Sequence, residues 1–287
     1  MIKRERHLYV GDMGSGKTRA LFNFAVRALE SGRKVFFLSL DNGHVRFMPK
    51  VERWSSGPDK RFFEYTCTNW EDFREKMREV RTMWEHGDWV LQDRLDIAWD
   101  FIQRYYKADR YGIPEDSLPD FVLSKRLEWL KEADKLEKSG DIGRARSIRN
   151  AVNMDGPPEI DWDLQKSSMS SVTYEIAAGR EAIQYDINYI ASTWATPGIT
   201  ARMSGGENKV ETDASKNDPR KLRAFNMTIQ GQKQVPGYFD TVLVLRKLPQ
   251  GYTLSTEKDR ERPRFMDEII GEDGVVDLYQ SLTGASF

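Results

Sequence analysis

A glycine-rich segment near the start of the chain carries the clearest chemistry in this sequence. It reads Gly11, Asp12, Met13, Gly14, Ser15, Gly16, Lys17 and Thr18, which satisfies the pattern G-x-x-x-x-G-K-[ST]. Glycines let the backbone curl so that successive N–H groups face a phosphate, and the N-terminus of a following helix adds its positive end. The lysine then reaches the β- and γ-phosphates, and the threonine hydroxyl ligates Mg²⁺. We therefore expect ATP with Mg²⁺ at this segment.

A carboxylate that suits the same metal ion ends a later apolar segment. Asp93 closes the run Trp89–Asp93, which reads as a buried strand. The end of such a strand is the usual place for the aspartate that holds Mg²⁺ opposite a phosphate-binding loop. We therefore predict Thr18 and Asp93 as the metal-binding pair.

Two further strand ends offer polar groups. Asp41 follows the apolar run 34–40, where its carboxylate can polarise the water that attacks the γ-phosphate. The sequence Asp41-Asn42-Gly43 is equally typical of a plain turn, and both interpretations stay open. Thr193 ends the run 187–193, with Ser192 and Trp194 beside it, and a polar side chain there can sense the γ-phosphate or simply finish a strand.

The elements that must position these residues alternate between strand and helix patterns. We expect strands at residues 7–10, 34–40, 62–66, 89–93 and 187–193, helices at 20–29, 73–84 and 175–185, and a final hairpin from 241–245 and 251–257 at the sheet edge. Such alternation predicts an α/β fold with a mainly parallel central sheet and helices on both faces. At 287 residues, the chain is most simply one domain, 1–287.

Two segments interrupt this alternation. Residues 105–171 are charged and helical in pattern, which predicts a helical insertion with Leu123, Leu127, Leu130 and Ala133 on its apolar side. Residues 196–221 have hardly an apolar side chain, so we expect a mobile loop. The basic residues in or beside this loop are Arg202, Lys209, Lys216, Arg220, Lys221 and Arg223. They can neutralise DNA phosphates, although the interspersed acids are equally in keeping with a solvated linker.

Composition excludes several other classes of function. The 44 basic and 45 acidic residues nearly cancel, so only a local surface can attract nucleic acid. One cysteine and three scattered histidines argue against disulfides and against a structural zinc site. The sequence contains no run of 18 apolar residues, so we expect no membrane span, and its first residues do not show a signal-peptide pattern. We therefore expect a cytoplasmic protein without membrane association, in the host cytoplasm if the chain is viral.

The order of these motifs resembles that of phage-encoded RecA-like P-loop proteins. This family includes the ATPase-type single-strand annealing proteins of phages and archaeal viruses. Two further segments carry the resemblance, VPGYFD at 235–240 before an apolar strand and TEKDR at 256–260. The resemblance covers residues 7 to about 100 and 185 to about 262, and only the glycine-rich segment is specific by itself. Aspartate stands at 41 where the RecA pattern has glutamate.

The resemblance implies a RecA-like ATPase that self-associates into a ring or filament and acts on single-stranded DNA in recombination or replication. It also implies that Lys258 and Arg260 reach the γ-phosphate bound by a neighbouring subunit, as an arginine finger does. Two other functions remain open. The pair Asp93-Arg94 at a strand end, with the insertion as a lid, is compatible with a nucleotide or small-molecule kinase. A motor ATPase that acts in DNA packaging or assembly is the third possibility.

Overall fold

In the computed structural model of this chain, the described residues are 5–153, 188–197, 220–231, 235–259, 262–271 and 274–283. The chain divides into two compact units, Met1–Trp99 together with Val172–Phe287, and Asp100–Ser171. The helix expected at 175–185, Arg260, and residues 198–219 of the expected loop lie outside the described residues.

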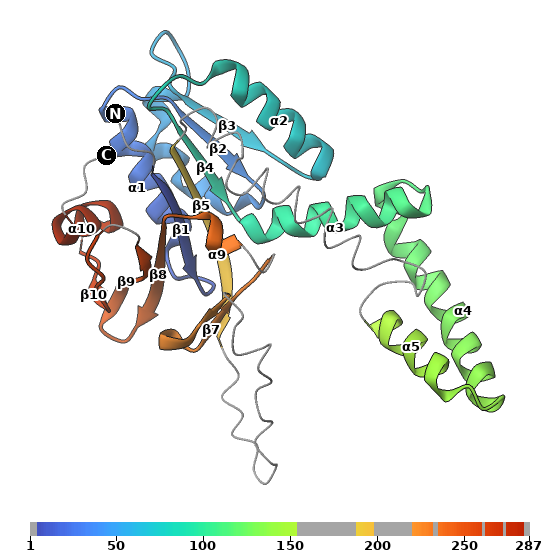
Figure 1. Ribbon diagram of the computed structural model, residues 1–287. Helices are drawn as coiled ribbons and strands as arrows, with labels where there is room; N and C mark the ends of the chain where they lie inside the picture. Colours follow the sequence, from blue (N-terminus) through green and yellow to red (C-terminus); the bar gives the residue numbers. More distant parts are fainter. Residues whose placement is uncertain are drawn as a thin grey trace. The chain divides into compact units, whose positions relative to one another are not determined.

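One sheet forms the first unit, with its main strands in the order β10-β9-β8-β1-β5-β4-β2-β3 (Figure 1). These strands are β1 (Arg6–Gly11), β2 (Val35–Ser39), β3 (Phe62–Thr66), β4 (Trp89–Asp93), β5 (Asn188–Pro197), β8 (Thr241–Leu248), β9 (Gly251–Asp259) and β10 (Glu268–Ile269). The strands from β8 to β3 in this order pair in parallel, whereas β9 and β10 are antiparallel. The predicted α/β class with a mainly parallel sheet is confirmed. The hairpin β8–β9 forms as predicted, but β10 adds a short strand outside it.

Two short strands extend the sheet at the carboxyl end of β5. β7 (Met227–Ile229) pairs with the last residues of β5 and with β6 (Lys221–Leu222). A 3₁₀ turn, η4 (Arg223–Phe225), joins them, and a short helix, α9 (Val235–Tyr238), precedes β8. The strand β7 therefore lies beside the strand end that carries Thr193.

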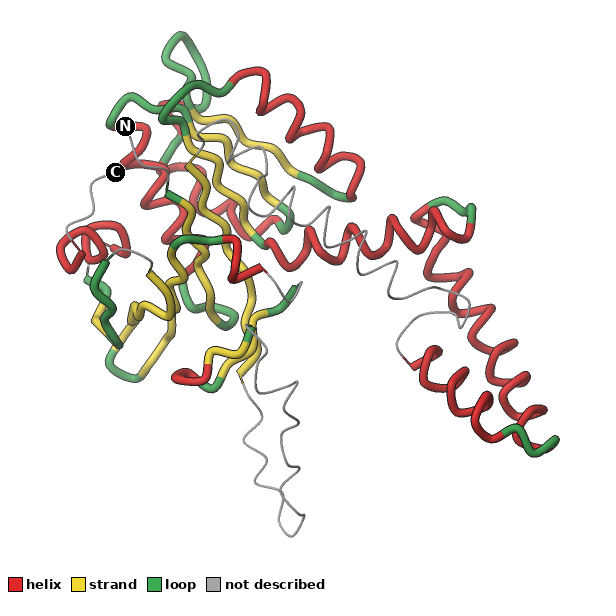
Figure 2. Tube along the Cα trace, viewed as in Figure 1, coloured by secondary structure: helices red, strands yellow, loops and turns green. Residues whose placement is uncertain are grey.

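Helices cover both faces of the sheet. On one face, α1 (Lys17–Glu30) and α10 (Gly274–Thr283) bury a continuous apolar cluster with strand residues such as Phe37, Leu91 and Ile190. The helix α2 (Trp70–Met83) lies on the other face (Figures 1 and 2). This placement follows from chain direction, because β1 to β2 and β3 to β4 step in opposite senses across the sheet and both crossovers are right-handed.

The helix α1 forms where its apolar residues recur at helical spacing. Ala20, Leu21, Phe24, Ala25, Ala28 and Leu29 are all buried. Gly16 precedes the helix in a left-handed conformation, with φ 94°, and no side chain caps the first turn. The helix ends at Ser31 and Gly32, whose φ of 87° suits glycine. Its first backbone N–H groups are thus left to face the preceding loop.

Two 3₁₀ segments follow β2 on the same side as α1. They are η1 (Asn42–Lys50) and η2 (Glu52–Trp54). Phe47 and Met48 pack on the apolar cluster beneath α1. The segment after Asp41 is therefore an ordered wall beside the first helix rather than a bare turn.

The second unit is helical. The helix α3 (Leu95–Tyr111) begins in the first unit, and η3 (Glu115–Ser117), α4 (Leu118–Lys138) and α5 (Ile142–Asn153) follow. A small core joins α4 and α5, formed by Trp129, Ala133, Ala145, Ile148 and Val152. The predicted apolar side of α4 is wrong in part, since Leu123 and Leu127 are 62% and 59% exposed. The helix α5 packs against the side of α4 that carries Trp129, so the buried side of α4 does not include those two leucines.

No helix within the described ranges combines the length and the apolar character that crossing a membrane requires.

Candidate functional site

The glycine-rich segment forms a tight loop between β1 and α1, at the carboxyl edge of the sheet. Gly14 and Gly16 have φ of 73° and 94°, which side chains rarely tolerate. At Gly11 a Cβ atom would lie 2.4 Å from both the carbonyl oxygen of Leu245 and the Oγ of Ser15. The glycines are therefore required by backbone conformation in two places and by close approach in the third.

Lys17 folds back into this loop. Its Nζ donates to the carbonyl oxygens of Gly11 and Asp12 at 2.8 and 2.9 Å, and lies 3.3 Å from the Oγ of Ser15. The side chain is buried, and this burial lowers the pKa of Lys17 to about 8 although Asp93 and other acids nearby favour the charged form. An ammonium group is thus held inside the loop by two carbonyl oxygens and a hydroxyl oxygen.

Asp93 meets the loop from the end of β4. Its Oδ2 accepts a hydrogen bond of 2.7 Å from the Thr18 hydroxyl, and its Oδ1 accepts one from Ser192. Asp93 is fully buried, and burial raises its pKa although both hydroxyl groups oppose that shift. The two residues predicted to bind the metal ion are therefore adjacent.

Asp41 takes part in two contacts at the end of β2. Its Oδ1 accepts from the backbone N–H of Gly43 at 3.1 Å, which caps η1, and its Oδ2 lies 3.3 Å from Nη1 of Arg94. The same guanidinium binds Asp96, with Nη2 2.6 Å from Oδ2. Asp41 thus caps the start of η1 while its carboxylate also faces Arg94 at the carboxyl edge, so both interpretations of Asp41 stay open.

Arg94 and Trp194 link these strand ends to the loop. Arg94 has φ 83°, a strained conformation for a residue with a side chain, and its N–H donates to Ser192. Its guanidinium lies 5.6 Å from the centre of the Trp194 ring. The indole Nε1 in turn donates to Oδ1 of Asp12 at 3.2 Å. The ends of β1, β2, β4 and β5 are therefore connected through polar contacts.

Thr193 does not lie on the same face of the sheet as Asp93. Its Oγ1 lies 3.3 Å from the carbonyl oxygen of Gln230 and 3.5 Å from Asp96. Successive side chains of a strand point to opposite faces, and the register places Ser192, rather than Thr193, on the face of Asp93. The structure therefore puts Ser192 where the sequence analysis placed Thr193.

Lys258 lies toward the amino ends of the parallel strands, away from the glycine-rich loop at their carboxyl ends. In the register of the strands it pairs with Val242, near the amino end of β8, whereas Gly11 pairs with Leu245. Its Nζ donates to the carbonyl oxygens of Pro236 and Phe239. The structure thus uses this lysine within its own chain, and it does not bring Lys258 to the loop. Its predicted companion, Arg260, lies outside the described residues.

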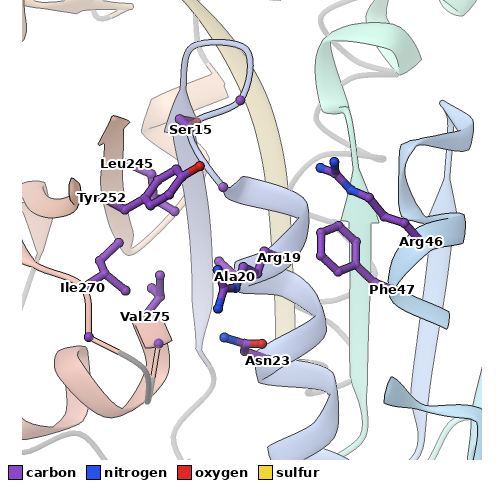
Figure 3. A pocket seen from close by; sticks show the side chains of 14 residues that line it. Ser15, Arg19, Ala20, Asn23, Arg46, Phe47, Leu245, Tyr252, Ile270 and Val275 are labelled. Atoms are coloured by element: carbon purple, nitrogen blue, oxygen red, sulfur yellow. The ribbon is translucent and has the colours of Figure 1, made fainter. Parts of the chain in front are cut away.

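A pocket of about 320 Å³ opens beside the loop (Figure 3). Gly14, Ser15 and Gly16 contribute to its lining, and so does the first part of α1. Its other walls come from η1, from the hairpin β8–β9, and from the segment around β10 and the start of α10. The pocket is therefore continuous with the loop.

Comparisons with known proteins add no assignment. No protein-family model matches this sequence, and a search of curated proteins finds no match. The geometry of the site alone therefore carries the functional interpretation.

The arrangement suits a phosphate-bearing ligand with a divalent cation. Curled backbone, a buried ammonium and an uncapped helix start meet at one point, next to a hydroxyl–carboxylate pair. Within the described ranges, no three His, Cys, Asp or Glu side chains are grouped as a metal site. Mg²⁺ does not need such a group, because it is commonly held by one or two protein oxygens together with water and substrate phosphates.

Sequence reasoning missed two contributors. Asp96 binds Arg94, which lies two residues before it, and also accepts from the backbone N–H of Trp194, which is remote in sequence. Tyr252, on β9, reaches the loop from the far end of the chain. The alternation of side chains along β5 predicts that Ser192 and Thr193 point to opposite faces of the sheet. Only the register with β4 shows that Ser192 is the one on the face of Asp93.

Proposed function

We propose that this chain is a RecA-like P-loop ATPase, which binds ATP with Mg²⁺ at Gly11–Thr18 and hydrolyses it to ADP and phosphate. The observation that carries the proposal is the hydrogen bond between Thr18 and Asp93, which joins the glycine-rich loop to the end of β4. Lys17 lies in the same loop. These are the three side chains that such a site needs for phosphate and metal.

The electrostatics support the proposal. Burial disfavours both the charged form of Lys17, whose pKa falls to about 8, and that of Asp93, whose pKa is raised. A triphosphate would stabilise the ammonium, and a divalent cation would stabilise the carboxylate. A bound ligand would therefore stabilise the charged forms of both groups, and such perturbed pKa values are typical of a functional site.

The order of the strands supports the RecA-like assignment. β5 lies between β1, which leads into the loop, and β4, which ends in Asp93. Ligands of open α/β sheets bind at the carboxyl ends of the strands. Ser192 at the end of β5 donates to the other oxygen of Asp93, so it is the strand-end hydroxyl that could respond to the presence of a γ-phosphate.

In this proposal each residue has a separate task. Bound Mg–ATP supplies the phosphoryl group that is transferred to water. The loop N–H groups and Lys17 bind its phosphates and stabilise the charge that develops on them, while Thr18 and Asp93 hold the metal ion. Asp41 is the candidate that orients the attacking water, with Arg94 fixing its carboxylate.

We further propose that the ATPase acts on single-stranded DNA. The support is the resemblance together with the basic residues between 196 and 223. The strands on either side of this segment are tied to the site, because β5 carries Ser192, and Gln230, directly after β7, donates its backbone N–H to the carbonyl oxygen of Trp194 at 2.8 Å. A change at the phosphates can therefore reach the segment through β5.

Hydrolysis by wild type and by Lys17→Ala, each with and without single-stranded DNA, tests both steps. We expect DNA to stimulate the wild type and the variant to lose hydrolysis under both conditions. Hydrolysis that is stimulated only by a protein partner would favour a motor ATPase in assembly or packaging over an ATPase that acts on single-stranded DNA. Phosphate transfer to added nucleosides would instead establish a kinase, and a fully active Lys17→Ala would refute the site.

A further inference from the structure

We infer that Arg94 is a catalytic arginine that acts on the nucleotide bound by its own chain, with its guanidinium on the γ-phosphate during hydrolysis. The inference rests on the proposed function, since it assigns a further residue to the same reaction. It differs from the role that the resemblance implies for Lys258 and Arg260, which would act at the site of a neighbouring subunit. Within one chain, Lys258 is bound near the amino ends of the parallel strands.

The backbone of Arg94 is fixed at the point where β4 turns into α3. Its N–H donates to Oγ of Ser192 at 3.0 Å, and its carbonyl oxygen accepts from the N–H of Ile97 at 3.1 Å. Its φ of 83° is a conformation that residues with a side chain rarely adopt, and it persists only where surrounding contacts hold it. Such strain directly after Asp93 is typical of a functional position.

The guanidinium is held close to the glycine-rich loop. Its carbon atom lies 5.6 Å from the centre of the Trp194 ring, whose Nε1 donates to Oδ1 of Asp12 in the loop at 3.2 Å. Its charge also reaches Lys17, because burial is the largest cause of the lowered pKa of that lysine and the charge of Arg94 lowers it further. A γ-phosphate bound by Lys17 would therefore lie in the field of Arg94 as well.

Two carboxylates orient the guanidinium and leave part of it for a ligand. Nε and Nη2 bind the two oxygens of Asp96 at 3.3 and 2.6 Å, and Nη1 lies 3.3 Å from Oδ2 of Asp41. A guanidinium carries five N–H donors, and these contacts use three of them. Within the described part of the chain, one N–H on Nη1 and one on Nη2 thus have no protein partner. Since the side chain is 26% exposed, this pair can bind phosphate oxygens.

A fixed cation at this place suits the charge that phosphoryl transfer creates. Water adds to the γ-phosphorus, the bond from that phosphorus to the bridging oxygen breaks, and the electron pair of this bond leaves with ADP. Both protons of the water end on the released phosphate. Negative charge is spread over the phosphoryl oxygens in between, and an arginine that is already oriented stabilises it. Burial disfavours the cation, but Asp96 and Asp41 outweigh it and raise the pKa of Arg94, so the charge is retained.

Arg94→Ala, assayed for steady-state hydrolysis and for nucleotide binding, tests this role. We expect kcat to fall by about 10³-fold or more, as for removal of an arginine finger. Aluminium fluoride, a mimic of the transferring phosphoryl group, should tighten binding of Mg–ADP by the wild type but not by the variant. Arg53→Ala is the matched control. Arg53 also pairs with a carboxylate, Glu30, and lies over an indole, Trp54, but it does so at the far end of α1.

Mixing two inactive variants separates action within one chain from action on a neighbour. Lys17→Ala keeps Arg94, and Arg94→Ala keeps the loop. If the arginine serves only its own chain, neither variant can complete the site of the other, so the mixture should stay inactive at every ratio. Hydrolysis that recovers on mixing would show that Arg94 acts on a neighbouring subunit, and the inference would be wrong.

Arg94→Lys repeats the test if the alanine variant unfolds, because it keeps a cation for both aspartates but lacks the planar fork. We expect this variant to bind a non-hydrolysable ATP analogue as the wild type does, and to lose about 10²-fold in kcat, as for loss of one transition-state donor. Hydrolysis at the wild-type rate by either Arg94 variant would overturn the inference and leave the proposed function standing. A wild type that does not hydrolyse ATP would refute the proposed function itself.

Discussion

The strand β1 lies between two ionic clusters whose charges behave in opposite ways. At its amino end, Glu5 binds His7 and Arg262, and Arg262 also binds Tyr279 with Nη1 2.9 Å from the hydroxyl oxygen. Tyr279 donates to Asp259. At its carboxyl end lie Lys17, Thr18 and Asp93 with their neighbours. We call these the amino-end cluster and the carboxyl-end cluster.

In the amino-end cluster the partners outweigh burial. Burial raises the pKa of Glu5, but hydrogen bonds and charge from His7 and Arg262 lower it to about 2 overall. The pKa of Arg262 is raised, because its contacts with Glu5 and Tyr279 more than offset its burial. Each charge is stabilised by the folded chain itself. The cluster therefore contributes to the stability of the fold.

In the carboxyl-end cluster burial outweighs the partners. It lowers the pKa of Lys17 to about 8 and raises that of Asp93. Without a ligand these charges cost stability. The comparison suggests a distinction between two kinds of buried charge. A charge that contacts within the chain do not stabilise indicates a binding site, whereas a charge that such contacts stabilise contributes to the fold.

Replacing Asp93 should give the largest effect. Asp93→Asn keeps the shape and can still accept from Thr18, but it removes the charge that holds the metal ion. We expect hydrolysis to fall by about 10²–10³-fold. Thermal unfolding without nucleotide should show no loss of stability, since a buried charge is removed. A steady-state ATPase rate of Asp93→Asn near that of the wild type would show that the carboxyl-end cluster is not a catalytic site.

Replacing Arg262 should have the opposite profile. Arg262→Met leaves Glu5 buried without one of its two partners, and breaking a buried ion pair typically costs about 3–5 kcal/mol. Urea unfolding measures this loss. Affinity for the ATP analogue should stay at the wild-type value, because the amino-end cluster lies at the other end of β1. Intact stability would show that this cluster is not structural.

Glu5→Gln tests the same cluster through pH. The variant should be less stable by about 2 kcal/mol at pH 7, as for loss of a hydrogen bond to a charged group. The pKa of Glu5 is lowered in the folded state, so its contribution is complete above the ordinary pKa of 4.5 and disappears as pH falls toward about 2. The difference between wild type and variant, followed by urea unfolding between pH 6 and 2.5, should therefore shrink on acidification. A constant difference would argue against a charged Glu5.

The carboxyl-end cluster was predictable from sequence to a larger degree than the amino-end cluster. Gly11–Thr18 and Asp93 are local signals, because the strand, turn and helix that surround them are contiguous in the chain. Glu5 and Arg262 meet across 257 residues, and nothing local to either residue indicates the other. The α/β class followed from alternation of patterns, while the face of β5 required the register with β4.

The same limit explains the other differences. Leu123 and Leu127 fit a helical apolar stripe, but the true stripe of α4 depends on where α5 packs. The role of Lys258 at a neighbouring subunit stays a prediction from the resemblance, and within one chain its Nζ is bound to carbonyl oxygens near α9. Tyr252 gave no signal in isolation, because the hairpin places it beside Gly16 only once the sheet has formed. Long-range packing decided each of these cases.

Lys17→Met gives the smallest expected effect and the sharpest test, because its sign is opposite to that of Arg262→Met. Lowering a lysine pKa from 10.5 to about 8 corresponds to roughly 3 kcal/mol of destabilisation of the charged form. Loss of the hydrogen bonds to Gly11 and Asp12 offsets part of the gain, so we expect the nucleotide-free variant to be more stable by about 1 kcal/mol at pH 7. The folded pKa is the lower one, so the wild type regains stability as pH rises from about 8 to 10.5, and the advantage of the variant should vanish over that window. Urea unfolding of both proteins at pH 7 and pH 10 measures this. A variant that is less stable at pH 7 would mean that the loop carbonyls compensate the ammonium fully, and the two ends of β1 would then no longer differ in kind.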